Sequence, residues 1–287
     1  MIITVASGKG GTGKTLIATS LALSLGNENK VQIVDCDVEE PNTHILLEPT
    51  FDRMISVSVP IPEVNNIQCT YCGDCSRICA FNAIAVLPEK VLIFPELCHG
   101  CGACAYLCPE NALVETNRKV GSIQIGYTGK IHFVQGQLKI GETMATPVIR
   151  AVKEYINHKH IVIVDASPGT ACPVVETVKG SDFCLLVTEP TPFGFHDLLL
   201  AMDMVKRLGI PFGVVINRCK DNDNEVEKFC LDRQIPVLLR IPLDIEIARL
   251  YAKGVTLVSG IPRWQKYFRD LLSDIKQLSL HNVGVSG

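Results

Sequence analysis

The sequence has little net charge and no long stretch of charges of one sign. Its 27 lysines and arginines against 30 aspartates and glutamates give a formal charge of −3. That balance does not predict a broad electrostatic surface for nucleic acid or anionic lipid. No apolar run approaches the roughly 20 residues that span a bilayer. Met1 leads directly into a β-type run without a basic region or cleavage site. We therefore expect a soluble cytoplasmic protein that binds no nucleic acid and does not insert stably into a membrane.

Cysteine, by contrast, is abundant and unevenly distributed. The 287-residue chain has 13 cysteines, and eight of them lie within residues 69–108. Without a secretory signal, metal or cluster binding is favoured over a disulfide framework. The eight form two runs of the pattern C-x2-C-x2-C-x3-C, each followed by a similar tail, which indicates an internal repeat. The first run has Cys69, Cys72, Cys75 and Cys79, and the second has Cys98, Cys101, Cys104 and Cys108.

The cysteine spacing is typical of iron–sulfur cluster binding. Closely spaced cysteines aim three thiolates at one cubane, and the fourth cysteine ligates the other cluster. The segment resembles the bacterial two-cluster ferredoxins, although Ala80 stands where that pattern usually has proline. The alternative is a structural zinc site, which needs only four ligands and which this doubled spacing disfavours. The resemblance implies one [4Fe-4S] cluster on Cys69, Cys72, Cys75 and Cys108, and another on Cys98, Cys101, Cys104 and Cys79.

A second motif, SGKGGTGKT, satisfies the phosphate-binding pattern G-x4-G-K-[ST] between an expected strand and an expected helix. Its glycines allow backbone N–H groups to converge on phosphate oxygens. Lys14 can reach the terminal phosphates, and the Thr15 hydroxyl can hold Mg²⁺. The motif predicts a site for ATP or ADP with Mg²⁺. Its residues are Gly8, Gly10, Gly11, Thr12, Gly13, Lys14 and Thr15.

Lys9, an additional lysine in this loop, makes the sequence resemble the deviant Walker A subfamily of P-loop ATPases. That subfamily includes the MinD and ParA division and partition ATPases, the nitrogenase iron protein and the Mrp-type iron–sulfur carriers. The resemblance covers residues 1–60 and about 120–287. It implies that Lys9 crosses the interface of an ATP-dependent homodimer to the partner's nucleotide. The alternative is a solvated loop lysine.

The same resemblance assigns roles to residues at strand ends. Asp37 would position the attacking water, and Asp35 could serve the metal. Asp165 ends the run IVIVD, from which its carboxylate can reach the Mg²⁺ shell. Gly169, in the sequence SPG, would sense the γ-phosphate through its N–H group. Contacts to adenine would come from Asn217, Arg218 and Pro242.

Strands and helices alternate along most of the chain, which predicts an α/β protein with a mostly parallel, doubly wound sheet flanked by helices. Residues 49–63 carry three prolines and indicate a connector, and residues 121–141 alternate like β-hairpins. The simplest organisation is a P-loop ATPase domain of residues 1–62 and 116–287 with a small α+β ferredoxin domain, residues 63–115, inserted. A final amphipathic helix begins at Trp264 and is expected to pack on the core. Further strands are expected at 161–165, 183–189, 212–217 and 235–241, and helices near 146–158, 195–208, 223–232 and 244–253.

The two motifs together predict a Mg²⁺-dependent ATPase that closes as a dimer on ATP. Hydrolysis would be coupled to electron transfer or to iron–sulfur cluster handling for an acceptor protein. Two alternatives stay open: a spatial-organising ATPase like MinD and ParA with a structural or redox-sensing ferredoxin module, and a ferredoxin with a vestigial ATP site. Cys172 stands at the offset of a cluster ligand in the nitrogenase iron protein. No second cysteine accompanies it, and the C-terminal C-x-x-C of the Mrp-type carriers is absent, so a packing thiol is equally favoured.

Overall fold

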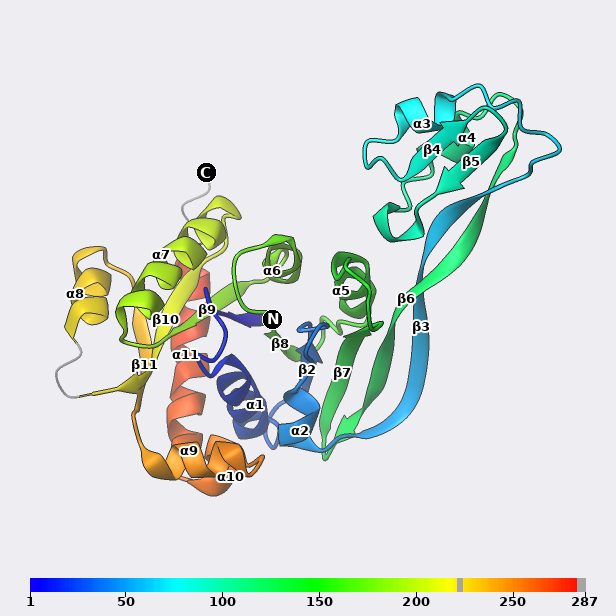
Figure 1. Ribbon diagram of the computed structural model, residues 1–287. Helices are drawn as coiled ribbons and strands as arrows, with labels where there is room; N and C mark the ends of the chain where they lie inside the picture. Colours follow the sequence, from blue (N-terminus) through cyan, green and yellow to red (C-terminus); the bar gives the residue numbers. More distant parts are fainter. Residues whose placement is uncertain (221–223, 283–287) are drawn as a thin grey trace.

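The computed structural model describes residues 1–220 and 224–282. Most of these residues build one large sheet with helices on both faces (Figure 1). Its nine strands within the described residues are β1 (Ile2–Ala6), β2 (Val31–Asp35), β3 (Thr50–Val64), β6 (Leu113–Thr128), β7 (Ile131–Leu138), β8 (Ile161–Asp165), β9 (Phe183–Thr188), β10 (Phe212–Cys219) and β11 (Val237–Pro242). Their order is β11-β10-β9-β1-β8-β2-β7-β6-β3. Neighbours from β11 to β7 are parallel, whereas β6 is antiparallel to both β7 and β3. The expected mostly parallel α/β sheet is confirmed.

The helices form two layers. One face carries α1 (Lys14–Leu25), α2 (Thr43–Leu47), α9 (Ile245–Ala252), α10 (Leu257–Gly260) and α11 (Trp264–Asn282). The other face carries α5 (Thr146–Lys153), α6 (Cys172–Val178), α7 (Pro192–Arg207) and α8 (Asn224–Asp232). Because the central strands are buried on both faces, their apolar residues run without interruption, as in β1 and β8. The four expected strands correspond to β8, β9, β10 and β11, and the four expected helices to α5, α7, α8 and α9. Residue 223, the expected start of α8, lies outside the described residues.

The final helix packs on the core, as predicted. Trp264, Phe268 and Ile275 of α11 are buried in one cluster with apolar side chains of α1 and β1. Within the described residues, none of the helices combines the length and apolar character needed to cross a membrane.

The expectation of a connector over residues 49–63 is wrong. These residues belong to β3, which pairs with β6 in a long antiparallel ribbon from Thr50 opposite Tyr127 to Val64 opposite Leu113. Pro60 lies within this strand, where its missing N–H group is tolerated because β3 is the edge strand of the sheet. The ribbon leaves the sheet and extends well beyond it (Figure 1).

A small lobe lies at the far end of this ribbon, and we call residues 65–112 the cysteine lobe (Figure 1). It contains β4 (Ile84–Leu87) paired with β5 (Lys90–Ile93), the short helices α3 (Asp74–Ile78) and α4 (Ala103–Tyr106), and a 3-10 turn at Pro95–Leu97. Its backbone repeats itself. Gly73 and Gly102 have positive φ immediately before α3 and α4, and Asn82 and Asn111 have positive φ after them. The internal repeat predicted from the cysteine spacing is therefore present in the fold.

The register of the sheet fixes the end from which the cysteine lobe projects. Strand β7 ends at Leu138, which lies opposite Gly121 of β6. Residues 113–120 of β6 therefore continue past the carboxyl end of β7, which runs parallel to β2. The lobe consequently lies beyond the carboxyl edge of the parallel strands, the edge at which α/β proteins place their ligands.

Candidate functional site

The glycine-rich loop joins the end of β1 to the start of α1 and is closely packed. Gly13 has a φ of 94°, and a Cβ atom there would lie 2.3 Å from Nδ2 of Asn217. A Cβ atom at Gly8 would lie 2.0 Å from the carbonyl oxygen of Asp197 in α7. Only glycine fits at these two positions, so the loop is held between α7 and the end of β10. This packing restrains the backbone of the loop at both of these glycines.

Lys14 and Thr15 open α1 and lie beside an acidic side chain. The hydroxyl of Thr15 donates to Oδ2 of Asp165 over 2.6 Å, and the hydroxyl of Thr43 donates to the same oxygen over 3.3 Å. The other oxygen of Asp165 is buried without a hydrogen-bond partner among the described residues. A hydroxyl beside a free carboxylate oxygen is a donor set that suits Mg²⁺. Burial raises the pKa of Asp165, and the nearby charge of Lys14 opposes that rise.

Asp35 ends β2 and Asp37 follows two residues later, and the two carboxylates face different surroundings. Both carboxylate oxygens of Asp35 accept backbone N–H groups, from Asp37 over 2.9 Å and from Thr43 over 3.1 Å. Burial, with the charge of Asp165 in addition, raises the pKa of Asp35. Asp37 lines the cavity at the glycine-rich loop. Burial raises its pKa, and the charge of Lys14 opposes that rise only in part. The contacts of Asp35 are those of a residue that shapes the loop after β2, and its metal role stays a prediction.

A cavity extends from the glycine-rich loop towards α9. Asn217, Arg218 and Pro242, the three residues expected to contact adenine, all line it. Asn217 donates from Nδ2 to the carbonyl of Thr12 over 2.7 Å and accepts the N–H of Arg218 over 2.9 Å, so it ties β10 to the loop. Sequence reasoning missed the opposite wall, for which the apolar spacing in α9 was the available signal. That wall consists of Leu243, Asp244, Ile247, Ala248 and Tyr251.

Lys9 is paired within its own chain. Its ammonium group donates to Glu189, a residue that follows β9, and Arg218 donates to the other oxygen of Glu189 over 3.0 Å. One carboxylate therefore holds a cation from the glycine-rich loop and a cation from the base end of the cavity. Its pKa is lowered, because the two cations outweigh the effect of burial. Lys9 is thus not a freely solvated lysine in this structure.

Gly169 occupies the loop after β8 with a φ of 100°. Its N–H group donates to the carbonyl oxygen of Ser7 over 2.9 Å. A contact between this N–H and a γ-phosphate requires that bond to be exchanged. The loop of Gly169 leads directly into α6, where Cys172 is the exposed first residue.

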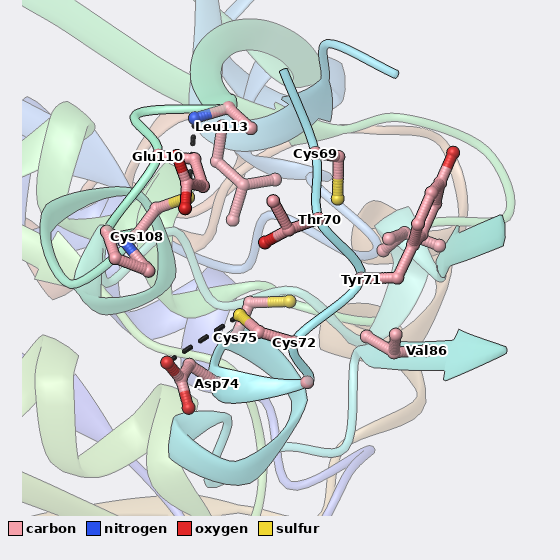
Figure 2. Close-up of a pocket in the computed structure, with 14 residues that line it drawn as sticks. Cys69, Thr70, Tyr71, Cys72, Asp74, Cys75, Val86, Cys108, Glu110 and Leu113 are labelled. Atoms are coloured by element: carbon pink, nitrogen blue, oxygen red, sulfur yellow. Dashed lines mark hydrogen bonds between the residues drawn. The ribbon is translucent and has the colours of Figure 1, made fainter. Parts of the chain in front are cut away.

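The cysteine lobe contains two hollows, and each is lined by one of the predicted sets of four cysteines. Figure 2 shows the first, where Cys69, Cys72 and Cys75 of one run face Cys108 of the other. Cys79 leaves its own run and lines the second hollow, whose other cysteines are Cys98, Cys101 and Cys104. The fold therefore brings together the crossed sets that the resemblance implied.

The fourth cysteine of each run has matching surroundings. Cys79 accepts the N–H of Ala83 and Cys108 accepts the N–H of Ala112, each over 3.3 Å. Among the described residues, no group of three or more histidine, cysteine, aspartate or glutamate side chains converges on a point that could hold a single metal ion. Next to the second hollow, His99 stacks on Phe81 with ring centroids 3.7 Å apart.

Burial raises the pKa of Cys75 and of Cys104, and the two preceding cysteines of the same run add to the effect in both cases.

The fold and the loop geometry define an α/β protein of the P-loop nucleotide-binding class. The chain belongs to the CobQ/CobB/MinD/ParA nucleotide binding domain family, whose model matches residues 3–258. An uncharacterized protein of Methanocaldococcus jannaschii, MJ0578, is 31% identical over 280 residues, which cover 96% of this chain and 97% of that protein. The iron-sulfur cluster carrier protein of Rickettsia typhi is 26% identical over 269 residues, covering 90% of this chain and 66% of that protein.

Solved structures show the same fold at lower identity. The septum site-determining protein MinD of Pyrococcus horikoshii, complexed with Mg-ADP, has a TM-score of 0.59 and 18% identity, with 98% of both chains covered. The MinD cell division ATPase of Pyrococcus furiosus has a TM-score of 0.57 and 20% identity, covering 96% of this chain and 98% of that chain.

Proposed function

We propose that this protein is a Mg²⁺-dependent ATPase. The carrying observation is the cavity in which the glycine-rich loop, Lys14 and Asp37 meet the Thr15–Asp165 pair. Lys14 would neutralise the terminal phosphates, and Asp37 would position water for attack. Thr15 and the free oxygen of Asp165 would hold Mg²⁺, which when bound neutralises phosphate charge.

The test of the proposed ATPase is phosphate release from MgATP by the purified full chain. Lys14→Ala should abolish hydrolysis because it removes the cation at the terminal phosphates. Lys130→Ala, at an exposed lysine in the turn between β6 and β7, is the matched control and should keep the wild-type rate. Hydrolysis that survives in Lys14→Ala would assign the activity to another site or to a contaminant.

The protein is further proposed to close as an ATP-dependent homodimer. Lys9 lies in the loop that holds the phosphates, and its side chain keeps 27% of its surface exposed although it is paired with Glu189. A cation held by one carboxylate can exchange that partner for the phosphates of a nucleotide bound to a second chain. Light scattering with MgATP and with MgADP tests this step. A single mass in both states contradicts it.

We also propose that residues 63–115 form a ferredoxin domain with two [4Fe-4S] clusters, inserted into an ATPase domain of residues 1–62 and 116–287. The fit rests on the two hollows, each lined by four cysteines of which one comes from the other run. Eight cysteines in this doubled spacing exceed the four ligands that one structural zinc ion takes, which favours two clusters over zinc. When bound, the clusters would each carry one electron at a time.

Iron and sulfide determination with EPR on anaerobically purified protein tests the cluster assignment. About eight irons per chain are expected for two four-iron clusters. Cys172→Ser removes an exposed cysteine outside the cysteine lobe and should keep about eight irons per chain, whereas a loss of iron would make Cys172 a ligand of a further cluster. Zinc in place of iron and sulfide refutes the assignment.

A continuous set of contacts supports a link between the nucleotide and the cysteine lobe. The ammonium group of Lys153 in α5 donates to three carbonyls at the end of α6, those of Glu176, Thr177 and Lys179, over 2.6, 3.0 and 2.6 Å. The loop before α5 carries Glu142, which pairs with Arg118 of the ribbon. Displacement of the Gly169 loop would therefore shift α6, then α5, then the ribbon. The proposed function is ATP hydrolysis coupled through this route to the clusters.

Electron transfer is the favoured use of the clusters, because cages with four thiolates each retain their clusters. Similarity to an iron–sulfur cluster carrier supports the other use, delivery to an acceptor protein. Incubation of the loaded protein with an apo-acceptor and a chelator separates the two. If both clusters remain on this chain, delivery is refuted. If the clusters move to the acceptor only with MgATP, electron transfer is refuted as their use.

A spatial-organising ATPase is the second candidate, and the fold likeness to MinD favours it. It predicts ATP-dependent binding to DNA or to lipid vesicles. Co-sedimentation of the protein with DNA or with lipid vesicles, measured with and without MgATP, tests this second candidate function.

A further inference from the structure

The wall of the cavity opposite Asn217 is formed by one face of α9. Ile247, Ala248 and Tyr251 all line the cavity, and their spacing places them on one side of the helix. Leu243, just before the helix, extends this wall and is 55% exposed. The polar groups for phosphate are all at the other end, in the glycine-rich loop. The cavity therefore has one end built for charge and one end where a mostly apolar helix wall accompanies Asn217 and Arg218.

Helix α9 holds this wall in place. The side chain of Asp244 caps its first turn by accepting the N–H of Glu246 over 2.7 Å. Ile247 is only 8% exposed and belongs to the core, and Leu250 packs against the same cluster from the next turn. The backbone that carries Tyr251 is thus fixed by contacts that do not involve the ring of Tyr251.

The Tyr251 side chain itself is the exception on this helix. It remains 44% exposed although it borders a cavity. Among the described residues, no aromatic ring or cation stacks on it. An exposed flat ring on a rigid helix at the apolar end of a phosphate-binding cavity is suited to cover another flat ring. Stacking of this kind accepts any nucleobase, because every base has a π face.

We propose that Tyr251 stacks on the base of the bound nucleotide and makes the site prefer nucleotides to inorganic polyphosphate. The inference rests on the proposed nucleotide site and adds the residue that recognises its base. Loss of one base–aromatic stack corresponds to a loss of about 5- to 100-fold in affinity. Because the stack is the same before and during phosphate transfer, the loss should appear in KM and not in kcat.

Calorimetric titration with two probes tests this assignment. MgATP has a base and magnesium tripolyphosphate has none. Tyr251→Ala should raise the Kd for MgATP about 5- to 100-fold and leave the Kd for tripolyphosphate unchanged. Tyr251→Phe keeps the ring and should bind MgATP within about 2-fold of wild type. Tyr267→Ala, at another half-exposed tyrosine in α11, is the matched control and should change neither Kd.

The titrations separate the stacking role of Tyr251 from the existence of the nucleotide site. An unchanged Kd for MgATP in Tyr251→Ala refutes the stacking role while leaving the nucleotide site intact. An equal loss for both probes also refutes it, since the effect then comes from the phosphate end. If the wild-type chain binds neither probe, the nucleotide site itself is wrong. A loss confined to MgATP that Tyr251→Phe restores supports the proposal.

Discussion

The ion pair between Arg118 and Glu142 joins the ribbon to the body of the protein, and its removal should be costly. The Glu142 side chain is 2% exposed and that of Arg118 is 15% exposed. Besides Arg118, Glu142 accepts the N–H groups of Thr143 over 3.1 Å and Met144 over 3.2 Å. Two further nitrogens of Arg118, Nε and Nη2, are buried without a partner among the described residues. Glu142 is therefore the counterion for a guanidinium that water barely reaches.

The expected magnitude follows from that burial. Breaking a buried pair by removing one partner costs about 3–5 kcal/mol, because the other charge is left uncompensated. Arg118 keeps some contact with water, and Gln at position 142 can still accept the two backbone N–H groups. We therefore expect Glu142→Gln to lower the free energy of unfolding by about 2–3 kcal/mol. Asp203→Asn breaks the exposed pair of Asp203 and Arg207, whose side chains are 61% and 79% exposed, and should cost less than about 0.5 kcal/mol.

Urea unfolding followed by the fluorescence of the single tryptophan, Trp264, measures the global change, since that side chain is buried in the core. Amide hydrogen exchange over residues 113–128 measures local opening of the ribbon. The double variant Arg118→Met with Glu142→Gln removes the stranded cation, so it should be more stable than Glu142→Gln alone. The reasoning is refuted if Glu142→Gln changes both measurements by no more than Asp203→Asn does.

The effect should also depend on pH in a definite direction. Burial raises the pKa of Glu142, but the hydrogen bonds from Arg118 and from two backbone N–H groups outweigh it and leave the pKa lowered. A lowered pKa in the folded state adds stability above the pKa of the unfolded state, about 4.3, and that stability is lost as the pH falls through the folded-state value. The difference between wild type and Glu142→Gln should therefore shrink between pH 7 and pH 3.

Three further predictions concern the two candidate sites. Cys108→Ser and Cys79→Ser should each disturb one cluster, and in Cys108→Ser the altered EPR signal should belong to the cluster held by the first run. Crossed ligation is contradicted if either variant loses only the cluster held by the run in which the substitution lies. Glu189→Gln should strengthen MgATP-dependent dimerisation, measured by light scattering, because it frees Lys9; an unchanged dimer constant shows that the Lys9–Glu189 pair does not oppose closure. Asp37→Asn should lower kcat for ATP hydrolysis at least 100-fold with little change in the Kd for MgATP, and a rate near wild type would remove Asp37 from the reaction.

The sequence could predict those features that depend on neighbours along the chain. The central strands were recognisable because both of their faces are buried and their apolar residues run together. The glycine-rich loop was recognisable because backbone N–H groups must approach phosphate closely. Strand β3 was missed because its prolines are tolerated only at a sheet edge, and its place at that edge is a property of the whole sheet. Helices α2 and α10 have 5 and 4 residues, which is too short for a periodic signal.

The residues of the site that escaped prediction depend on contacts between distant segments. Glu189 is the partner of Lys9 across 180 positions, and nothing near Glu189 marks it as a counterion. Tyr251 lines the cavity only because α9 follows β11, whose last residue, Pro242, pairs with Cys219 at the end of β10. The crossed cysteine sets were foreseen through a resemblance, since spacing within one run cannot tell which thiol crosses to the other hollow.

The register of the ribbon places the candidate nucleotide site and the cysteine lobe at the same edge of the sheet. The phosphate loop follows β1, and Asp37 and Asp165 lie at the carboxyl ends of β2 and β8. The ribbon leaves β6 beyond the carboxyl end of β7, so the cysteine lobe projects from this same edge. A lobe inserted at the edge pair β3–β6 leaves every parallel strand and its ligand loop undisturbed, and it projects from the edge that carries the glycine-rich loop. Closure of two chains over nucleotide at this edge would therefore bring the two cysteine lobes into one assembly. That arrangement predicts that an inter-chain spin-label distance between Tyr106→Cys residues, measured on cluster-loaded protein that also carries Cys172→Ser, appears with MgATP and does not appear when Lys9→Ala is added.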